Sequence, residues 1–427
     1  MVTRGNLWGV WIFLLVAHWI LGESMTRAEI LGQLSLSAIW VMLVFVTGLL
    51  IATLNISRLT LPWIKRQPGS WKTFRIYRWL ARFWLFLLFE GSVMFIINLF
   101  IGVSYSEDWL YPALHELITW GVYALAVMGV TIYICSSPRR ASTIANSIKL
   151  TFLVLLIFLM LNPTRSLAAE VAVAGSAAVF LVRRTTLRWS LFIIALGVLA
   201  ASGSRTATLA FIVGHILTYL SSLKITRPRT WYPLLISVVL IAMSTPFVLS
   251  ASVGKRTAAL IQVGLQAGLE GVLETQEGAY LTQGRSAVWP AILKHALQRA
   301  TFGHGPGTAS AYAFYVSQNS RFAHPHNEYL RIFHNYGLVG LLAFMNIYII
   351  IILYAKLSAS LKGNSSAQLW SNALMASTLA SLSLFMTDNI GLYAFVISIH
   401  GTIVGASLCI GSLPCTATGI SRQAKRG

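Results

Sequence analysis

The stretch LVGLLAFMNIYIIIILY, residues 338–354, decides the fold, because it contains no charged side chain and reads as a helix that crosses a lipid bilayer. A straight membrane-spanning helix needs about 20 apolar residues, so such a run borrows a few flanking residues. Similar runs recur in about twelve blocks along the 427-residue chain. They cover approximately 7–21, 30–53, 80–104, 109–135, 147–162, 167–182, 189–202, 206–223, 231–250, 338–354, 368–387 and 391–411.

The composition agrees with this pattern, since 56% of the residues are hydrophobic and only 10% are charged. A soluble domain carries about 25% charged residues. We therefore predict an all-α polytopic membrane protein with about 12 transmembrane helices. The first block, 7–21, has no small-x-small cleavage site after it and a second block begins at once, so we expect a retained helix rather than a signal peptide.

The net charge of +20 would suggest a nucleic-acid partner in a soluble protein, but its distribution does not. Lys and Arg gather in every second segment between the blocks, whereas the short segments between them hold one or none and include Glu107–Asp108. Lys and Arg in short loops favour the cytoplasmic side of a membrane. We therefore predict that both termini are cytoplasmic, and we expect the lipid bilayer, not nucleic acid, as the partner of this charge.

One long polar segment divides the chain into three parts: residues 1–250 with helices 1–9, residues 251–337 as a large periplasmic loop, and residues 338–427 with helices 10–12 and a short cytoplasmic tail. Within the loop, SAVWPAILKHALQRA has helical spacing, with Pro290 expected to start or kink a helix. The run FGHGPGTASAY predicts a glycine-rich turn. We expect this loop to be partly helical and to carry the active site.

The loop ends in HPHNEYLRIFHNYG, residues 324–337, which concentrates polar groups beside the apolar run. Pro325 suits a first helical turn and Gly337 a helix end, so the pattern predicts a short surface helix hinged onto the next span. His326 is expected in its first turn, where the helix dipole disfavours the imidazolium ion. A neutral histidine can act as a general base. The alternative without a function is that these polar residues only form the solvent-exposed face of a helix at the membrane interface.

Metal binding is the main rival for the histidines. Four of them could in principle gather around zinc, namely His304, His324, His326 and His334. However, no carboxylate or cysteine completes a recognised spacing, and His326 and His334 would point roughly 80° apart on a helix. We therefore predict no metal site. The cysteines Cys135, Cys409 and Cys415 likewise show neither a metal spacing nor an obvious disulfide pair.

Two arginines occupy unusual positions, Arg205 in ASGSRTATLAF at the mouth of an apolar block and Arg285 in LTQGRSAVW in the loop. Arginine at a membrane mouth is costly unless it meets an anion, and its fork matches phosphate oxygens. With a neutral base, they favour transfer from a lipid-linked phosphate or pyrophosphate donor; snorkelling to the interface is the alternative. Arg165, Arg321 and Arg331 are weaker candidates for the same role.

Three carboxylates are expected within or beside the spans, Glu90, Glu116 and Glu170. Each could orient an arginine, line an acceptor path or pair within the bundle. The sequence leaves these three roles open.

The pair His326–Asn327, followed after nine residues by Gly337-Leu-Val-Gly340, resembles the signature of the bacterial O-antigen ligase and polymerase superfamily. Ser204–Arg205, Gly284–Arg285 followed by Trp289, and the turn Gly303–Gly307 are similar to other features of this superfamily. The similarity of motifs is confined to about 200–345, while the similarity of topology covers the whole chain.

This resemblance implies an inverting glycosyltransferase that needs neither metal nor cofactor and acts at the periplasmic face of the bacterial inner membrane. The implied donor is a glycan on undecaprenyl pyrophosphate, and the acceptor is the sugar of lipid A–core. His326 matches the general base, and Arg205 and Arg285 match the arginines that bind pyrophosphate. Asn327 and Arg321 complete the predicted substrate-binding set.

Several alternatives stay open. Some ligases have Thr-Thr where this chain has Leu341–Leu342, so a polymerase that extends a growing O-antigen or exopolysaccharide is the second prediction. A protein O-oligosaccharyltransferase would have a longer C-terminal region. A polysaccharide transporter would show paired repeats and charged, broken helices near the midplane, whereas the polar cluster here is expected at the surface. A purely structural membrane subunit is the last alternative.

Overall fold

The structure is a computed structural model that describes residues 4–25, 29–30, 34–54, 70–103, 109–137, 139–222, 285–317, 324–359, 365–388, 391 and 393–412. These residues are almost entirely helical. The helices are α1 (Arg4–Met25), α2 (Leu36–Leu54), α4 (Ser70–Ile101), α5 (Leu110–Ser136), α6 (Arg140–Leu161), α7 (Arg165–Phe180), α8 (Thr185–Ala201), α9 (Arg205–Ser222), α13 (Arg285–Ala296), η3 (Leu297–Arg299), α14 (Thr308–Ser317), α15 (Glu328–Ala359), α16 (Ser365–Phe385) and α17 (Ala394–Ser412). Two-residue strands β1 (Glu29–Ile30) and β2 (Leu34–Ser35) pair antiparallel.

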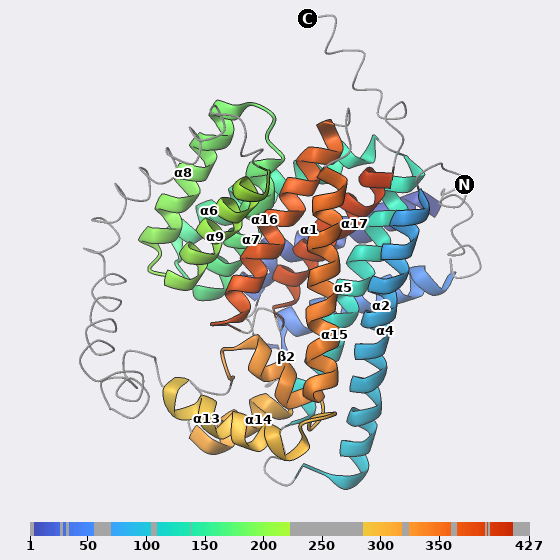
Figure 1. The fold of residues 1–427 in the computed structure, drawn as a ribbon, viewed down its shortest axis with the longest axis vertical. Coiled ribbons are helices and arrows are strands. Elements are labelled where there is room, and N and C mark those ends of the chain that lie inside the picture. Colours follow the sequence, from blue (N-terminus) through green and yellow to red (C-terminus); the bar gives the residue numbers. More distant parts are fainter. Residues whose placement is uncertain are drawn as a thin grey trace, which may run out of the picture.

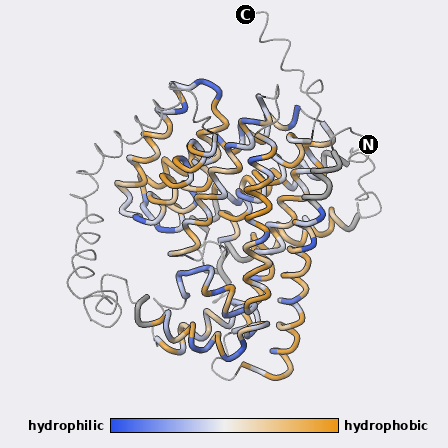
Figure 2. The backbone as a smooth tube through the Cα atoms, viewed as in Figure 1, coloured by the Kyte–Doolittle hydropathy of each residue, from blue (hydrophilic) through white to orange (hydrophobic). Residues whose placement is uncertain are grey.

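The helices form a bundle with a smaller group of helices at one end (Figure 1). Helices α13 and α14 lie together at that end, next to the beginning of α15. The bundle helices are coloured mainly as hydrophobic, and hydrophilic residues gather in the connections and around α13 and α14 (Figure 2). The polar chemistry that the sequence places before residue 338 is thus found at one end of an apolar bundle.

Eleven of the predicted apolar blocks overlap described helices, although the block 30–53 begins in the strands β1 and β2 and is helical only from Leu36. The ninth block, 231–250, lies outside the described residues. Within the described part of the chain, five helical segments are long and apolar enough to cross a membrane: Arg78–Ile101, Leu110–Cys135, Arg140–Leu161, Glu328–Ala359 and Ala394–Gly411. Three shorter helices are apolar as well, Leu7–Ile20, Ile39–Ala52 and Thr185–Ala201. These findings support a helical, polytopic membrane protein.

Helix α7 lies at the centre of the bundle, in contact with α6, α9, α16 and α17. Its sequence RSLAAEVAVAGSAAVF is rich in Ala, Gly and Ser, and from Leu167 onward every residue is buried. Small side chains let helix backbones approach closely in a membrane, where packing rather than water drives helix association. The Thr164 hydroxyl accepts a hydrogen bond from the Leu167 backbone N–H at 3.3 Å and caps the helix.

Helix α15 connects the polar end to the bundle and changes direction at Gly337. There φ is 63° and ψ is −164°, so two helical segments meet at a kink. The predicted hinge at Gly337 is therefore present. In the predicted loop, α13 begins at Arg285, which puts Pro290 inside the helix rather than at its start.

The cysteines differ from the prediction, because Cys135 of α5 and Cys409 of α17 form a disulfide. Their Cα atoms lie 5.9 Å apart. They are separated by 274 residues in sequence, and only the close packing of α5 against α17 brings them together. No local spacing in the sequence carries that information.

Candidate active site

His326 lies against a buried carboxylate at the polar end of the bundle. Its Nδ1 is 3.5 Å from Oδ1 of Asp388, whose side chain is 1% exposed, while the His326 side chain is 19% exposed. Asp388 follows α16, and the Tyr393 hydroxyl donates to the same Oδ1 at 3.2 Å. A carboxylate at Nδ1 favours the tautomer with a proton on Nδ1 and a lone pair on Nε2. A partly exposed imidazole held in this way can accept a proton from a hydroxyl.

The backbone at His326 corrects the predicted helix boundary. Among the described residues, His326 is the non-glycine residue with a positive φ, at 50°, and α15 begins only at Glu328. Asn327 caps the helix, because its Oδ1 accepts a hydrogen bond from the Leu330 N–H at 3.0 Å. His326 thus precedes the first turn instead of lying within it. A left-handed non-glycine residue costs of order 1–3 kcal/mol and is most often found at a functional site.

Neighbouring elements hold the segment before His326 in place. The Trp289 indole N–H of α13 donates to the Pro325 carbonyl at 2.5 Å. The Ser310 hydroxyl of α14 and Nδ1 of His324 are hydrogen-bonded at 3.0 Å. Helices α13 and α14 therefore both hold the two residues that precede His326 in place.

The first turn of α15 carries a buried cluster of charges. Arg331 is fully buried and forms salt bridges with Glu116 of α5 and Glu328 of α15. Its Nε donates to Glu328 at 2.9 Å. The second oxygen of Glu116 accepts from the Gly307 N–H at 2.9 Å and from the Asn335 side chain at 2.8 Å. Both carboxylate partners of Arg331 are buried with it, so its guanidinium group pairs inside the protein and is not exposed to a phosphate. The prediction of Arg331 as a weaker candidate for anion binding was therefore wrong.

The glycine-rich turn packs directly on the kink of α15. The backbone N–H groups of His304 and Gly305 donate to the carbonyls of His334 and Asn335 at 2.9 and 2.8 Å. A Cβ on Gly303 would meet the Asn335 backbone at 2.5 Å, and one on Gly337 would meet the Thr301 carbonyl group at 2.3 Å. Both glycines also have positive φ, so the two crossing backbones require them.

The predicted arginines occupy helix starts. Arg205 is the first residue of α9, which packs along α16 with Gly214 against Ala376 and Ala380. Arg285 is the first residue of α13, one turn before Trp289, and its side chain is not among those described. Arg321 falls in 318–323, which the structure does not describe. The roles of Arg205, Arg285, Arg321 and Asn327 in substrate binding stay predictions.

The structure gives different surroundings to the three carboxylates whose roles the sequence left open. Glu116 orients an arginine, namely Arg331. Glu90 is buried in α4 close to the kink of α15, since a Cβ on Gly340 would lie 3.4 Å from its Oε2. Glu170 is fully buried in α7. The roles of Glu90 and Glu170 stay open.

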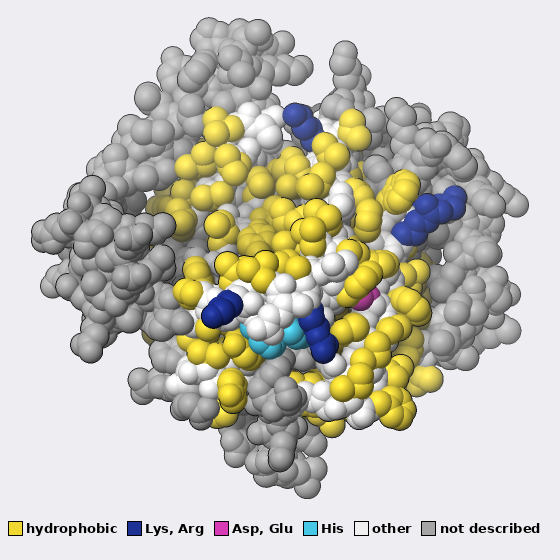
Figure 3. Space-filling model, turned by 60° about the horizontal axis from the view of Figure 1, so that its bottom comes forward, with side chains coloured by type: hydrophobic (Ala, Val, Ile, Leu, Met, Phe, Trp, Pro, Cys, Tyr) yellow, Lys and Arg dark blue, Asp and Glu magenta, His cyan; other side chains and the backbone are white. Residues whose placement is uncertain are grey.

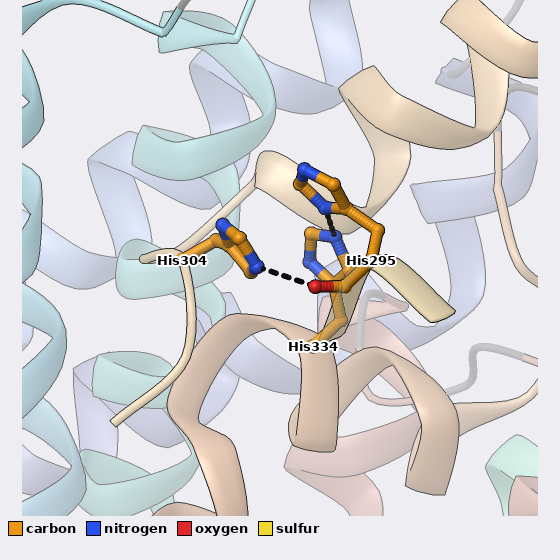
Figure 4. A group of neighbouring side chains, drawn as sticks. All are labelled: His295, His304 and His334. Carbon is orange, nitrogen blue, oxygen red and sulfur yellow. Dashed lines mark hydrogen bonds between the residues drawn. The ribbon is translucent and has the colours of Figure 1, made fainter. Parts of the chain in front are cut away.

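Three histidines from three separate elements form a second cluster: His295 of α13, His304 of the glycine-rich turn and His334 of α15 (Figure 4). One ligand nitrogen from each lies within 4.8 Å of the others. His295 Nδ1 and His334 Nε2 are 2.9 Å apart. Burial, together with nearby His304 and Arg299, lowers the pKa of His295 to about 4, and burial also lowers the pKa of His304. Both rings are therefore neutral at neutral pH.

This cluster differs from the set of histidines weighed on the sequence. The structure joins His304 and His334 to His295, which that set did not contain. His324 bonds Ser310 and His326 faces Asp388 instead. Histidine side chains gather on the face of the molecule that carries α13 and α14, flanked by basic side chains within a largely apolar surface (Figure 3).

The protein thus combines apolar helices long enough to cross a membrane with a histidine–carboxylate pair at the polar end of the bundle. Residues 190–345 match the family model described as O-Antigen ligase. This match contains Arg205, Arg285 and His326, and it confirms the resemblance to the O-antigen ligase and polymerase superfamily. Members of the matched family are glycosyl-transferring enzymes that process O-antigen. A comparison with curated proteins finds no match.

Sequence reasoning missed two residues of these clusters. Asp388, 62 residues after His326, was not selected as a candidate, and His295 was seen only as part of a helical pattern. A buried acid directly after an apolar helix is costly unless it has a partner, and this signal alone could have drawn attention to Asp388.

Proposed function

We propose that the protein transfers a glycan from undecaprenyl pyrophosphate to a sugar hydroxyl of lipid A–core, with His326 as the general base. The observation that carries this proposal is the His326–Asp388 pair, in which a buried carboxylate lies behind a partly exposed imidazole. The match of residues 190–345 to the O-Antigen ligase family supports the reaction class.

The proposed reaction is a single inverting displacement. The acceptor hydroxyl oxygen attacks the anomeric carbon of the donor sugar while Nε2 of His326 takes the hydroxyl proton. The bond between the anomeric carbon and the pyrophosphate oxygen breaks, and undecaprenyl pyrophosphate leaves with both bonding electrons. Arg205, Arg285 and Arg321 neutralise the negative charge that develops on the leaving group, and Asn327 contacts substrate. Asp388 stabilises the imidazolium, so the step needs no metal ion.

The proposed setting is the periplasmic face of a bacterial inner membrane. About 12 helices, divided as 1–250 and 338–427, would span it, with both termini in the cytoplasm and 251–337 as the periplasmic loop. The alternation of Lys and Arg along the sequence supports this orientation. It puts His326 at the water edge, where the lipid of the donor lies in the bilayer and its sugar lies in water.

The second candidate is a polymerase of the same superfamily, in which the acceptor is a growing O-antigen or exopolysaccharide on a second lipid carrier. Leu341–Leu342 in place of the Thr-Thr of some ligases favours it.

Purified protein in liposomes tests the proposal. The donor is a glycan on undecaprenyl pyrophosphate, the acceptor is lipid A–core, and products are separated on gels. Ligation yields glycan on lipid A–core, whereas polymerisation lengthens the lipid-linked glycan and leaves the core unchanged. Wild-type protein that makes neither product would contradict the proposed function.

A further inference from the structure

The cluster of His295, His304 and His334 lies where α13, the glycine-rich turn and α15 meet. Its ring centroids are 4.1 Å apart for His295 and His304, 4.7 Å for His304 and His334, and 5.1 Å for His295 and His334. His334 is fully buried and His304 nearly so. Tyr312 of α14 stacks on His295, with ring centroids 4.0 Å apart. Three neighbouring imidazoles, two of them buried, offer a ligand set for one ion.

The spacing suits one small transition-metal ion. Zinc binds imidazole nitrogen at about 2.0–2.1 Å, so two ligands of one tetrahedral ion lie about 3.3 Å apart. The nitrogens of His295 and His334 are already 2.9 Å apart, and all three ligand atoms fall within 4.8 Å. The three rings are nearly parallel, at 18–25° to one another, so each ring must rotate to turn a nitrogen lone pair toward a common point. A water molecule would supply the fourth ligand.

The surroundings of His334 fix which nitrogen faces the cluster. Its Nδ1 lies 3.4 Å from Asn335 Oδ1 and 3.4 Å from the Thr308 hydroxyl. The Asn335 amide donates to Glu116 at 2.8 Å and so turns its oxygen toward His334. A hydrogen-bond acceptor on one imidazole nitrogen is the usual way in which proteins orient a histidine ligand and leave its other nitrogen for the metal.

The charge nearby also favours a cation. Glu116, Glu328 and Arg331 carry a formal charge of −1 together in the fully buried cluster that Asn335 joins to His334. Loading an ion would replace the hydrogen bond between His295 and His334 and the one from His304 Nε2 to the His295 carbonyl at 2.9 Å. Bonds between neutral groups are exchanged for stronger metal–nitrogen bonds.

We propose that His295, His304 and His334 bind one divalent transition-metal ion, Zn²⁺ by preference, which fastens α13 and the glycine-rich turn to the first turns of α15. The ion has a positioning role. It holds α13, whose Trp289 donates to the Pro325 carbonyl beside His326, and the reaction at His326 still proceeds without metal chemistry. The site is independent of the proposed function, because His326 is not one of its ligands.

Zinc titration of the full-length protein in detergent, stripped with a chelator, tests this site. We expect calorimetry to find one Zn²⁺ per chain, and Co²⁺ to give the visible absorption of a tetrahedral nitrogen site. His295→Gln and His304→Gln should weaken binding at least tenfold, consistent with loss of one of three ligands. His334 is buried and its substitution risks unfolding, so the half-buried His295 carries the test.

Lys294→Ala is the matched control, because Lys294 is an exposed neighbour on the same helix. It should bind Zn²⁺ as wild type does, and so should His326→Ala, which separates this site from the proposed base. Added Zn²⁺ should raise the unfolding midpoint of wild type by several degrees and leave that of His295→Gln unchanged. Wild type that binds no Zn²⁺, or His295→Gln and His304→Gln that bind it as tightly as wild type, would overturn the proposal and leave a hydrogen-bonded histidine stack.

Discussion

Replacing Asp388 by Asn tests whether the buried carboxylate works through His326. Unit charges 3.5 Å apart attract each other by about 5 kcal/mol at an effective dielectric constant of about 20. Because the His326 side chain is partly exposed and the contact is long, we take about 3–4 kcal/mol as the loss in the transition state, which corresponds to a 10²–10³-fold fall in kcat. Asn preserves the shape of the side chain but not its charge, so KM should stay within about threefold.

The assay is single-turnover glycan transfer in liposomes, with the unfolding midpoint measured in parallel. Asp388→Glu should recover part of the rate, and Tyr393→Phe, which removes only one hydrogen bond to Asp388, should slow transfer less than about tenfold. His326→Ala/Asp388→Asn should be no slower than His326→Ala alone, because the two residues act as a unit. A kcat within threefold of wild type in Asp388→Asn, or additive losses in the double variant, would refute this reasoning.

Two further predictions concern stability, both measured as unfolding in detergent. Arg331→Met leaves two buried carboxylates without their cation and should cost about 3–5 kcal/mol; an unchanged midpoint would show that the cluster does not hold the fold. Gly337→Ala forces a Cβ to 2.3 Å from the Thr301 carbonyl group at a positive φ and should cost at least about 2 kcal/mol. Gly197→Ala in α8 is its control, because a Cβ there meets nothing within 4 Å, and it should be neutral or stabilising by up to about 1 kcal/mol; equal effects of the two substitutions would contradict the account.

Local sequence patterns predicted much of this architecture. Apolar runs located the helices, since burial in lipid leaves a one-dimensional signature in composition. Gly337 was found as a hinge because its residue type suits a helix end. His326 was selected because a polar group beside an apolar span needs a reason to be there.

Pairings across the bundle could not be predicted in the same way. His326 and Asp388 are neighbours only because α16 packs against α15. Arg331 is excluded as an anion ligand only by its salt bridge with Glu116 of α5, which the sequence does not predict. The Cys135–Cys409 disulfide depends on the contact of α5 with α17. Periodicity describes which face of a helix is buried, but it does not name the neighbour.

The predicted start of α15 was wrong, because the capping preference of Asn327 outweighs the helix preference of the residues before it. Asn327 caps the helix with its side chain, so the helix begins after it and leaves His326 in a left-handed conformation. The general preference for Pro in a first turn predicted the opposite, and the capping hydrogen bond decided the boundary.

The most direct test of the central claim is the single-turnover rate of glycan transfer by His326→Ala relative to wild type, in liposomes and with a chelator present. His324→Ala is the matched control, because His324 lies two residues away and bonds Ser310 instead of Asp388. The account predicts that chelation slows wild-type transfer by less than about tenfold, because the proposed ion only positions α13. It also predicts that His326→Ala slows transfer by about 100-fold or more, and that His324→Ala slows it by less than about tenfold. Transfer by His326→Ala at the wild-type rate would contradict the assignment of His326 as the base.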